Sequence, residues 1–124
     1  MDLKSKHKQV EKGVRRGWIL YLLYMSHPKP TDFHTLIKLL DFYNFPLSHR
    51  RFAEKLDFLC GLKLMRVFPL GAESPLSEVE QARLIQKYCE SDGEMDSHVC
   101  ASLTTKGVNY QEGHFEETGV VRVN

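Results

Sequence analysis

The sequence lacks a long hydrophobic run. Its longest apolar stretch, Trp18 to Met25, is far shorter than the roughly 20 residues that a helix needs to cross a bilayer. The basic first residues are not followed by a small-residue cleavage site, so they do not resemble a secretory signal. We therefore expect a cytoplasmic protein without a membrane partner.

Cysteine is scarce. Its three copies, Cys60, Cys89 and Cys100, are widely spaced, and an odd, scattered set is typical of a reducing compartment. His98 and Cys100 are not accompanied by a second pair of metal-ligand type, so alternation along a strand explains Cys100 more simply than a metal site. We expect neither a metal nor a cofactor.

Signatures of catalysis are also missing. The sequence has no Gly-rich phosphate loop and no Gly-x-Ser-x-Gly motif, and its six histidines are scattered. The acidic residues between Glu90 and Asp96 do not fit a calcium-binding loop, because the glutamate of the twelfth position is absent. We therefore do not expect an enzyme.

Charge is present in quantity but is divided unevenly. The net charge is only +1, yet residues 1–68 hold 13 Lys and Arg against 6 Asp and Glu, whereas residues 69–124 hold 4 against 10. Such asymmetry suggests that one face meets an anion while the remainder is solvated or meets a basic partner. A basic arm and an acidic surface loop without any partner would give the same counts.

Hydrophobic spacing predicts a helix from Val10 onward, after a flexible basic arm at residues 1–9. Apolar residues repeat at helical intervals and their neighbours widen the stripe almost all round the helix, at Val14, Trp18, Leu22 and Met25. Two prolines end this helix before His27. A helix so apolar is either central in the core or shared with a second copy of the chain.

Two further helices follow. Thr31 or Asp32 is a suitable N-cap for the first, whose apolar face comprises Phe33, Leu36, Ile37 and Leu40. Asn44, which tolerates a left-handed conformation, and Pro46 break the pattern. Ser48 is the next N-cap candidate, and the core stripe of the second helix comprises Phe52, Leu56 and Leu59. Gly61 comes where a helix often needs a left-handed residue.

The rest of the chain alternates between predicted strands and predicted helices. Residues 62–68 alternate between apolar and basic, as a half-buried strand does, and residues 69–75 form a loop. Ser77 and Glu80 fit a capping box for a helix to about Glu90, with Ala82, Ile85 and Cys89 on one side. The alternative is a strand over residues 82–89. Residues 98–103 predict a return strand, residues 104–112 a short helix, and residues 120–123 a strand-like tail.

Candidate functional residues cluster around the second helix of the predicted helix-turn-helix, whose N-terminal part enters the major groove of DNA in such motifs. The DNA-contact candidates are Ser48, His49, Arg50, Arg51, Lys55, Lys63 and Arg66. Arginine suits guanine edges and phosphates alike. Glu54 and Asp57 reduce the charge of this helix, so a solvated helix of mixed charge has the same pattern. The cations of the N-terminal segment can neutralise phosphates, at Lys4, Lys6, Lys8, Lys12, Arg15 and Arg16.

Three segments resemble winged-helix transcriptional regulators: residues 47–52, the Gly-Leu step at residues 61–62, and the Leu-Thr-Thr-Lys-Gly run at residues 103–107. In that family a recognition helix ends in a Gly-Leu step and the second wing strand ends in Leu-Thr-x-x-Gly. The run Gly-Val-Val-Arg at residues 119–122 is similar to small, largely uncharacterised winged-helix proteins of Mu-like prophages. The departure is residues 69–97, because a wing normally turns within a few residues.

The sequence therefore predicts a mainly helical α+β protein, a winged helix-turn-helix over residues 10–112. An acidic segment is inserted at about residues 69–97, and residues 113–124 form a tail. The resemblance implies a phage or prophage regulator that binds double-stranded DNA as a homodimer. The alternative is a protein-interaction or dimerisation module without DNA binding, with the acidic segment meeting a protein partner.

Overall fold

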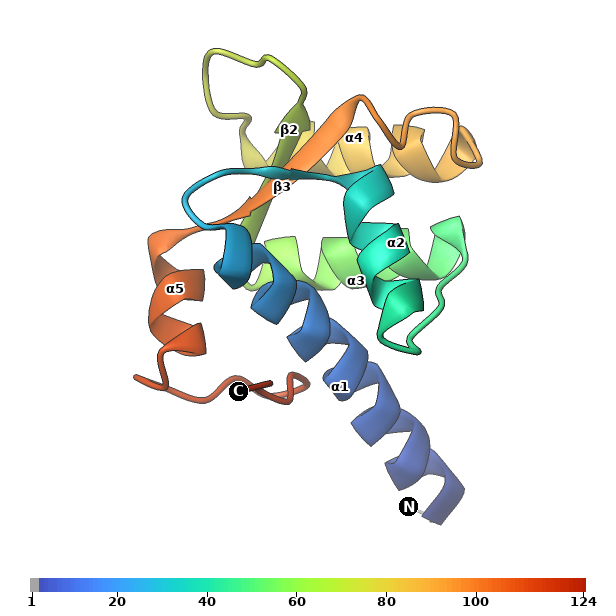
Figure 1. Ribbon diagram of the computed structural model, residues 1–124, viewed down its shortest axis with the longest axis vertical. Helices are drawn as coiled ribbons and strands as arrows, with labels where there is room; N and C mark the ends of the chain where they lie inside the picture. Colours follow the sequence, from blue (N-terminus) through green and yellow to red (C-terminus); the bar gives the residue numbers. More distant parts are fainter. Residues whose placement is uncertain (1–2) are drawn as a thin grey trace.

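The computed structural model describes residues 3–124, with side chains from Lys8 onward, and this part of the chain folds into helices around a small antiparallel sheet (Figure 1). The helices are α1 (Leu3–Ser26), α2 (Phe33–Phe42), α3 (His49–Gly61), α4 (Glu78–Glu90) and α5 (Thr105–Gln111). The strands are β1 (Thr31–Asp32), β2 (Met65–Pro69) and β3 (Val99–Leu103). The predicted α+β class is confirmed. Within the described residues, no helix has the length and apolar character needed to span a membrane.

Helix α1 begins earlier than the sequence predicts. It starts at Leu3 and not at Val10, so residues 3–9, the predicted flexible arm, are helical, while Met1 and Asp2 lie outside the described residues. Lysine and glutamine are good helix formers, and a polar helical turn has no apolar periodicity by which to recognise it. The predicted C-terminal end is confirmed, because α1 stops at Ser26 before the two prolines.

Polar caps fix the ends of α2 and α3 as predicted. The Asp32 carboxylate accepts a hydrogen bond from the Thr35 amide, and the Ser48 hydroxyl accepts one from the Arg51 amide. Asn44, in the turn between the helices, has a left-handed φ of 67°. These caps satisfy amides that have no partner within their own helix.

The C-terminal end of α3 differs from the prediction. The left-handed residue is Lys63, with a φ of 63°, and not Gly61, which is the last residue of the helix. The Lys63 amide donates to the Cys60 carbonyl and the Leu64 amide donates to the Leu59 carbonyl. This pair of hydrogen bonds is a Schellman motif, and it carries the chain directly into β2.

The strand β3 lies at the centre of the sheet, between β1 and β2, and is antiparallel to both. All five of its residues are buried. Met65 of β2 is paired with Leu103, and Pro69 with Val99. The predicted return strand is thus confirmed, whereas the strand predicted over residues 62–68 begins only at Met65, because residues 62–64 form the turn that follows α3.

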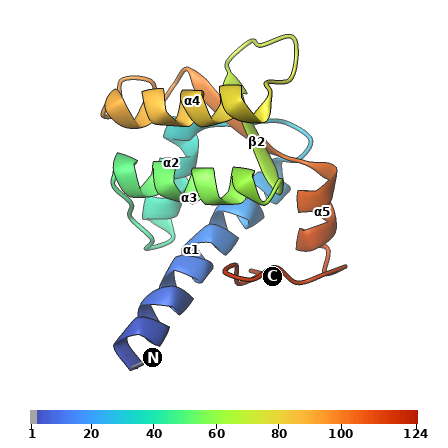
Figure 2. The same ribbon diagram turned by 180° about the vertical axis from the view of Figure 1, so that it is seen from behind.

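The predicted helix after Ser77 is confirmed and the alternative strand is wrong. Both hydrogen bonds of the capping box are formed between Ser77 and Glu80. The buried face differs from the prediction, because Ile85 and Tyr88 are buried while Ala82 is exposed. Helix α4 runs beside α3 in the opposite direction and covers the edge of β2 (Figure 2), where the Gln81 side chain accepts a hydrogen bond from the Val67 amide.

The core lies between β3 and the first three helices. It is filled by fully buried side chains from each of these elements, including Ile19, Leu20, Leu23, Phe33, Leu36, Leu40, Phe52, Leu56, Leu59 and Ala101. The core residues predicted for α3 are all among them. The stripe predicted for α1 is only partly buried: Leu22 is in the core, Val14 and Trp18 are half-buried, and Met25 is exposed. The other core residues of α1 are Ile19, Leu20 and Leu23.

The C-terminal tail is not a strand. Residues 120–123 lie along the N-terminal half of α1, where the Val121 amide donates to the Gly13 carbonyl at 3.0 Å. A Cβ atom at Gly17 would collide with the Val121 carbonyl, so the glycine permits this close approach. Arg16 donates from Nη1 to the Gly119 carbonyl at 2.9 Å. The tail therefore packs against the middle of α1, between Gly13 and Gly17.

Candidate nucleic-acid interface

Several of the predicted DNA-contact residues are engaged within the protein. Ser48 caps α3, and His49 Nε2 lies 3.1 Å from the Asp96 carboxylate of the inserted segment. The exposed Arg50 lies 3.7 Å from Glu54, one turn further along the same helix. The structure thus separates these three residues into different surroundings.

The two candidates after α3 also have partners. Lys63 Nζ lies 3.3 Å from the Glu78 carboxylate at the start of α4, and Arg66 Nε donates to the Ser102 hydroxyl at 3.2 Å. Acidic residues of the inserted segment therefore interrupt the surface that the predicted set was expected to form. The structure does not bring all seven candidates into one uncompensated positive patch.

Arg51 and Lys55 face the opposite side of α3. Together with the first turns of α1 they line a groove of about 390 Å³, which we call the α1–α3 groove. Its residues are Lys8, Glu11, Lys12, Arg15, Leu47, Arg51, Glu54 and Lys55. Five of these eight side chains are cationic and two are acidic, so the groove carries a positive charge.

Lys55 is the centre of this groove. Only 6% of the residue is exposed, although its ammonium group is charged at neutral pH in water. Burial lowers the pKa of Lys55, and the nearby charges of Arg16, Arg15 and Lys12 lower it further, in that order. Of the nearby charges, the Glu54 carboxylate raises the pKa of Lys55, so desolvation and repulsion are offset only in part, and a cation buried among cations opposes folding.

Each of the two carboxylates in the groove lies beside an arginine. Glu11 lies 4.0 Å from Arg15, which also lines the groove, and Glu54 lies 3.7 Å from Arg50. Within the described part of the chain, Lys12, Arg51 and Lys55 form no ion pair. The exposed Lys12 and Arg51 are therefore available to an anion from outside, and the buried Lys55 lines the same groove.

Arg16 has a structural role beside the groove. Its guanidinium lies 3.6 Å from the centre of the Phe58 ring, and it also bonds the tail at Gly119. The first contact joins α1 to α3, and the second joins α1 to the C-terminal tail. The groove is consequently a built feature, positioned by the tail and by Phe58.

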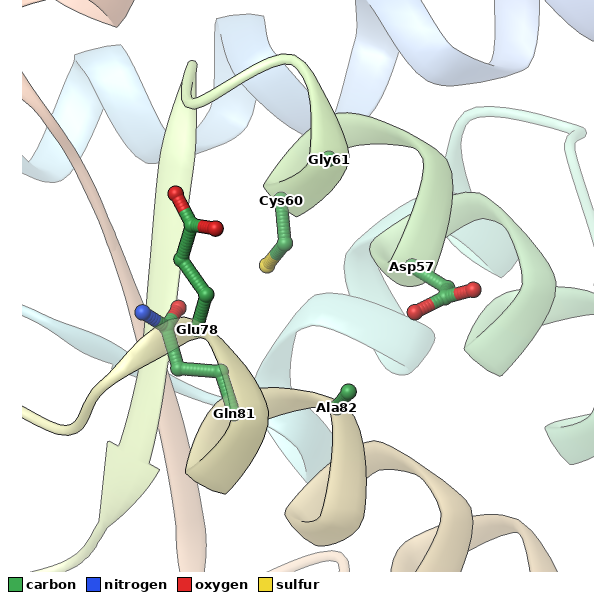
Figure 3. Close-up of a pocket in the computed structure, with 6 residues that line it drawn as sticks. All are labelled: Asp57, Cys60, Gly61, Glu78, Gln81 and Ala82. Atoms are coloured by element: carbon green, nitrogen blue, oxygen red, sulfur yellow. The ribbon is translucent and has the colours of Figure 1, made fainter.

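On its other flank, α3 faces α4 across a small pocket (Figure 3). The Cys60 side chain points into the gap between the two helices, where Asp57 and Glu78 supply negative charge. Burial, together with Asp57, raises the pKa of the Cys60 thiol to about 12. This flank is acidic and does not suit an anion.

The cations of the groove were predicted from the sequence, but their position in one groove was not. Arg51 and Lys55 were predicted as one contact and the N-terminal cations as another. The spacing of Lys8, Lys12 and Arg15, by four and then three residues, places these cations on one helical face once the helix is known to start early. The side chains of Lys4 and Lys6 lie outside the described residues.

The chain matches no model of a known protein family, no curated protein and no solved structure.

Proposed function

We propose that this protein is a winged-helix protein that binds double-stranded DNA and acts as a transcriptional regulator, with the phosphate backbone held in the α1–α3 groove. The element order supports the winged-helix part of this proposal. Helices α2 and α3 are joined by a short turn, and the antiparallel strands β2 and β3 follow. Helix α4 stands where a wing would turn.

The burial of Lys55 among other cations is the observation that carries the proposal. Charge that destabilises the free protein is retained where a ligand relieves it, and a row of phosphates supplies negative charge along the length of a groove. Arg51 lies in the first turn of α3, so a backbone in the groove also reaches the end of this helix. The contacts are made to phosphates and not to base edges, because the positive charge of the exposed Arg50 is offset by the Glu54 carboxylate.

Fluorescence anisotropy with a mixed pool of 20-base-pair duplexes, over a series of salt concentrations, tests this proposal. The logarithm of the binding constant should fall with the logarithm of salt with a slope of about −3, because the three cations of the groove without an ion pair meet phosphates. The double variant Lys12→Ala/Arg51→Ala should lose about 2 from this slope.

The matched control is Lys29→Ala/Lys63→Ala, which removes the same charge from two exposed positions outside the groove. It should keep the wild-type slope. Equal losses in both double variants would show that the net charge matters and the groove does not. No binding to duplex at low salt would rule out the DNA-binding function for this chain.

A second candidate is a protein-interaction module or homodimer without DNA binding. Exposed apolar side chains favour it: Val10 and Met25 on α1 are 57% and 61% exposed, and Val79 on α4 is 61% exposed. The inserted segment at residues 69–97, which holds seven Asp and Glu against two Lys and Arg, suits a basic protein partner. Sedimentation over a range of concentrations tests the dimer, which should weaken in the variant Val10→Ser/Met25→Ser.

A further inference from the structure

Aromatic rings form a continuous row beside the groove, from the turn after α2 to α1. Phe45 lies 5.4 Å from Trp18, Trp18 is stacked on Tyr43 at 4.9 Å and 27°, and Phe42 meets Tyr43 edge-on at 5.1 Å. We call these four residues, Phe45, Trp18, Tyr43 and Phe42, the aromatic row. Its rings are held in place by one another.

The outer end of the row faces solvent. Phe42 is 76% exposed and Tyr43 is 37% exposed, whereas Phe45 and Trp18 are half-buried against the core. A single exposed apolar residue is ordinary in a folded protein. A contiguous series of rings that ends in exposed rings is different, because it offers aromatic surface to a planar ligand.

The aromatic row is continuous with the α1–α3 groove. The Arg15 guanidinium, which lines the groove, lies 5.9 Å from the centre of the Phe45 ring. Leu47, two residues after Phe45, lines the groove as well. A nucleotide chain with phosphates in the groove therefore carries its bases next to the row.

We propose that the aromatic row binds unpaired bases, so that the groove and the row together form a site for single-stranded nucleic acid. This inference rests on the proposed phosphate-binding function of the groove. In a duplex the faces of the bases are covered by their neighbours, so only a single strand presents them for stacking. Such sites combine a positive groove with aromatic rings and are tolerant of sequence.

The neighbouring charges favour this occupant over a second copy of the chain. Copies related by a two-fold axis at the row would each bring Arg15 and the cations behind it to the same interface. Like charges facing each other oppose association. A polyanion with exposed base faces is attracted by both parts of the surface.

Trp18 provides a direct signal, because it is the only tryptophan of the chain and is stacked within the row. The probes are a 20-nucleotide thymidine strand and a 20-base-pair duplex, each titrated into the full-length protein. We expect the single strand to bind at least tenfold more tightly and to quench Trp18 fluorescence, with a smaller change on duplex binding.

The variants Phe42→Ser and Tyr43→Leu should each weaken single-strand binding about tenfold and leave duplex binding within about twofold. Phe42 is largely exposed, so its replacement tests stacking without disturbing the core, and Val79→Ser is the control at an exposed apolar position of α4. Urea unfolding of each variant verifies the fold.

Three outcomes would overturn the inference. The single strand binds no more tightly than the duplex; Phe42→Ser and Val79→Ser weaken single-strand binding equally; or the protein self-associates and Phe42→Ser abolishes the association. In each of these cases, salt-dependent duplex binding would leave the proposed function of the groove standing. Failure of both probes to bind would end the inference and the proposed function together.

Discussion

The two flanks of α3 differ in how their basic side chains are paired. Toward α4, basic side chains meet carboxylates: His49 lies against Asp96, and Lys63 lies against Glu78. Toward α1, cations meet cations around the buried Lys55. The first arrangement holds the inserted segment to the domain. The second arrangement opposes folding, so we expect the ligand to bind on the flank toward α1.

The two flanks also differ in packing: the flank toward α4 is closed, and the flank toward α1 is open. The α4 flank is closed by Tyr88, which is fully buried and meets Phe33 edge-on at 4.8 Å. The α1 flank is an open groove bridged by long side chains, with Arg16 over Phe58 at its edge. The comparison teaches that α4 is part of the structural core while the α1–α3 groove is a binding surface.

The largest expected effect comes from opening the α4 flank. The substitution Tyr88→Ala removes a buried ring and should lower the free energy of unfolding by about 3–5 kcal/mol, measured by urea denaturation. Val79→Ala, at an exposed position of the same helix, should change it little. If Tyr88→Ala behaved like Val79→Ala, α4 would not belong to the cooperative core.

The tail that packs against α1 gives the next effect. Gly17→Ala should lower the free energy of unfolding by about 1–3 kcal/mol, because the added Cβ displaces the tail at Val121. Alanine alone would stabilise a helix by roughly 1 kcal/mol. That gain should appear in the control Gly61→Ala, where a Cβ meets no atom within 4 Å. Equal gains in both variants would contradict the close packing of the tail.

The alkaline pH dependence of stability isolates Lys55. Its pKa is lowered in the folded protein from the ordinary 10.5, so between the folded value and 10.5 the unfolded chain binds more protons. The free energy of unfolding therefore rises with pH in that window as Lys55 loses its proton. Below the window Lys55 is charged in both states, and its destabilising effect on the folded protein is fully present. Denaturation of wild type and Lys55→Met between pH 8 and 10.5 should show their difference shrinking, and a constant difference would exclude repulsion at this site.

The smallest effect is expected for the exposed pair Lys63 and Glu78, whose side chains are 70% and 75% exposed. Lys63→Ala should cost less than about 0.5 kcal/mol and leave DNA affinity near that of the wild type. A loss of DNA binding comparable to that of Lys12→Ala, measured by anisotropy, would place the DNA on the α4 flank. The α4 flank, and not the α1–α3 groove, would then be the binding surface.

Much of the local structure could be predicted from the sequence because its signals are local. The caps at Asp32, Ser48 and Ser77, and the prolines after Ser26, fix helix ends through neighbouring residues. The early start of α1 was missed because a polar helix lacks apolar spacing. The left-handed residue at Lys63 was missed because glycine is the usual choice there.

The candidate site could be predicted only in part, because it depends on distances between separate elements. The sequence contains Arg51, Lys55 and the cations of α1, but their convergence follows from how α1 crosses α3 and from the tail that fixes it. The partners of His49 and Lys63 are set in the same way by the position of α4. Charge counts along the chain could not distinguish compensated cations from uncompensated ones.

The most direct test is the single variant Lys55→Met, which keeps the length of the side chain and removes its charge. Our account predicts opposite effects on two measurements: the free energy of unfolding at neutral pH rises by about 1 kcal/mol, while DNA affinity falls about tenfold and the salt slope shrinks by about 1. A less stable protein with unchanged DNA affinity would contradict it, because Lys55 would then serve the fold and not a ligand.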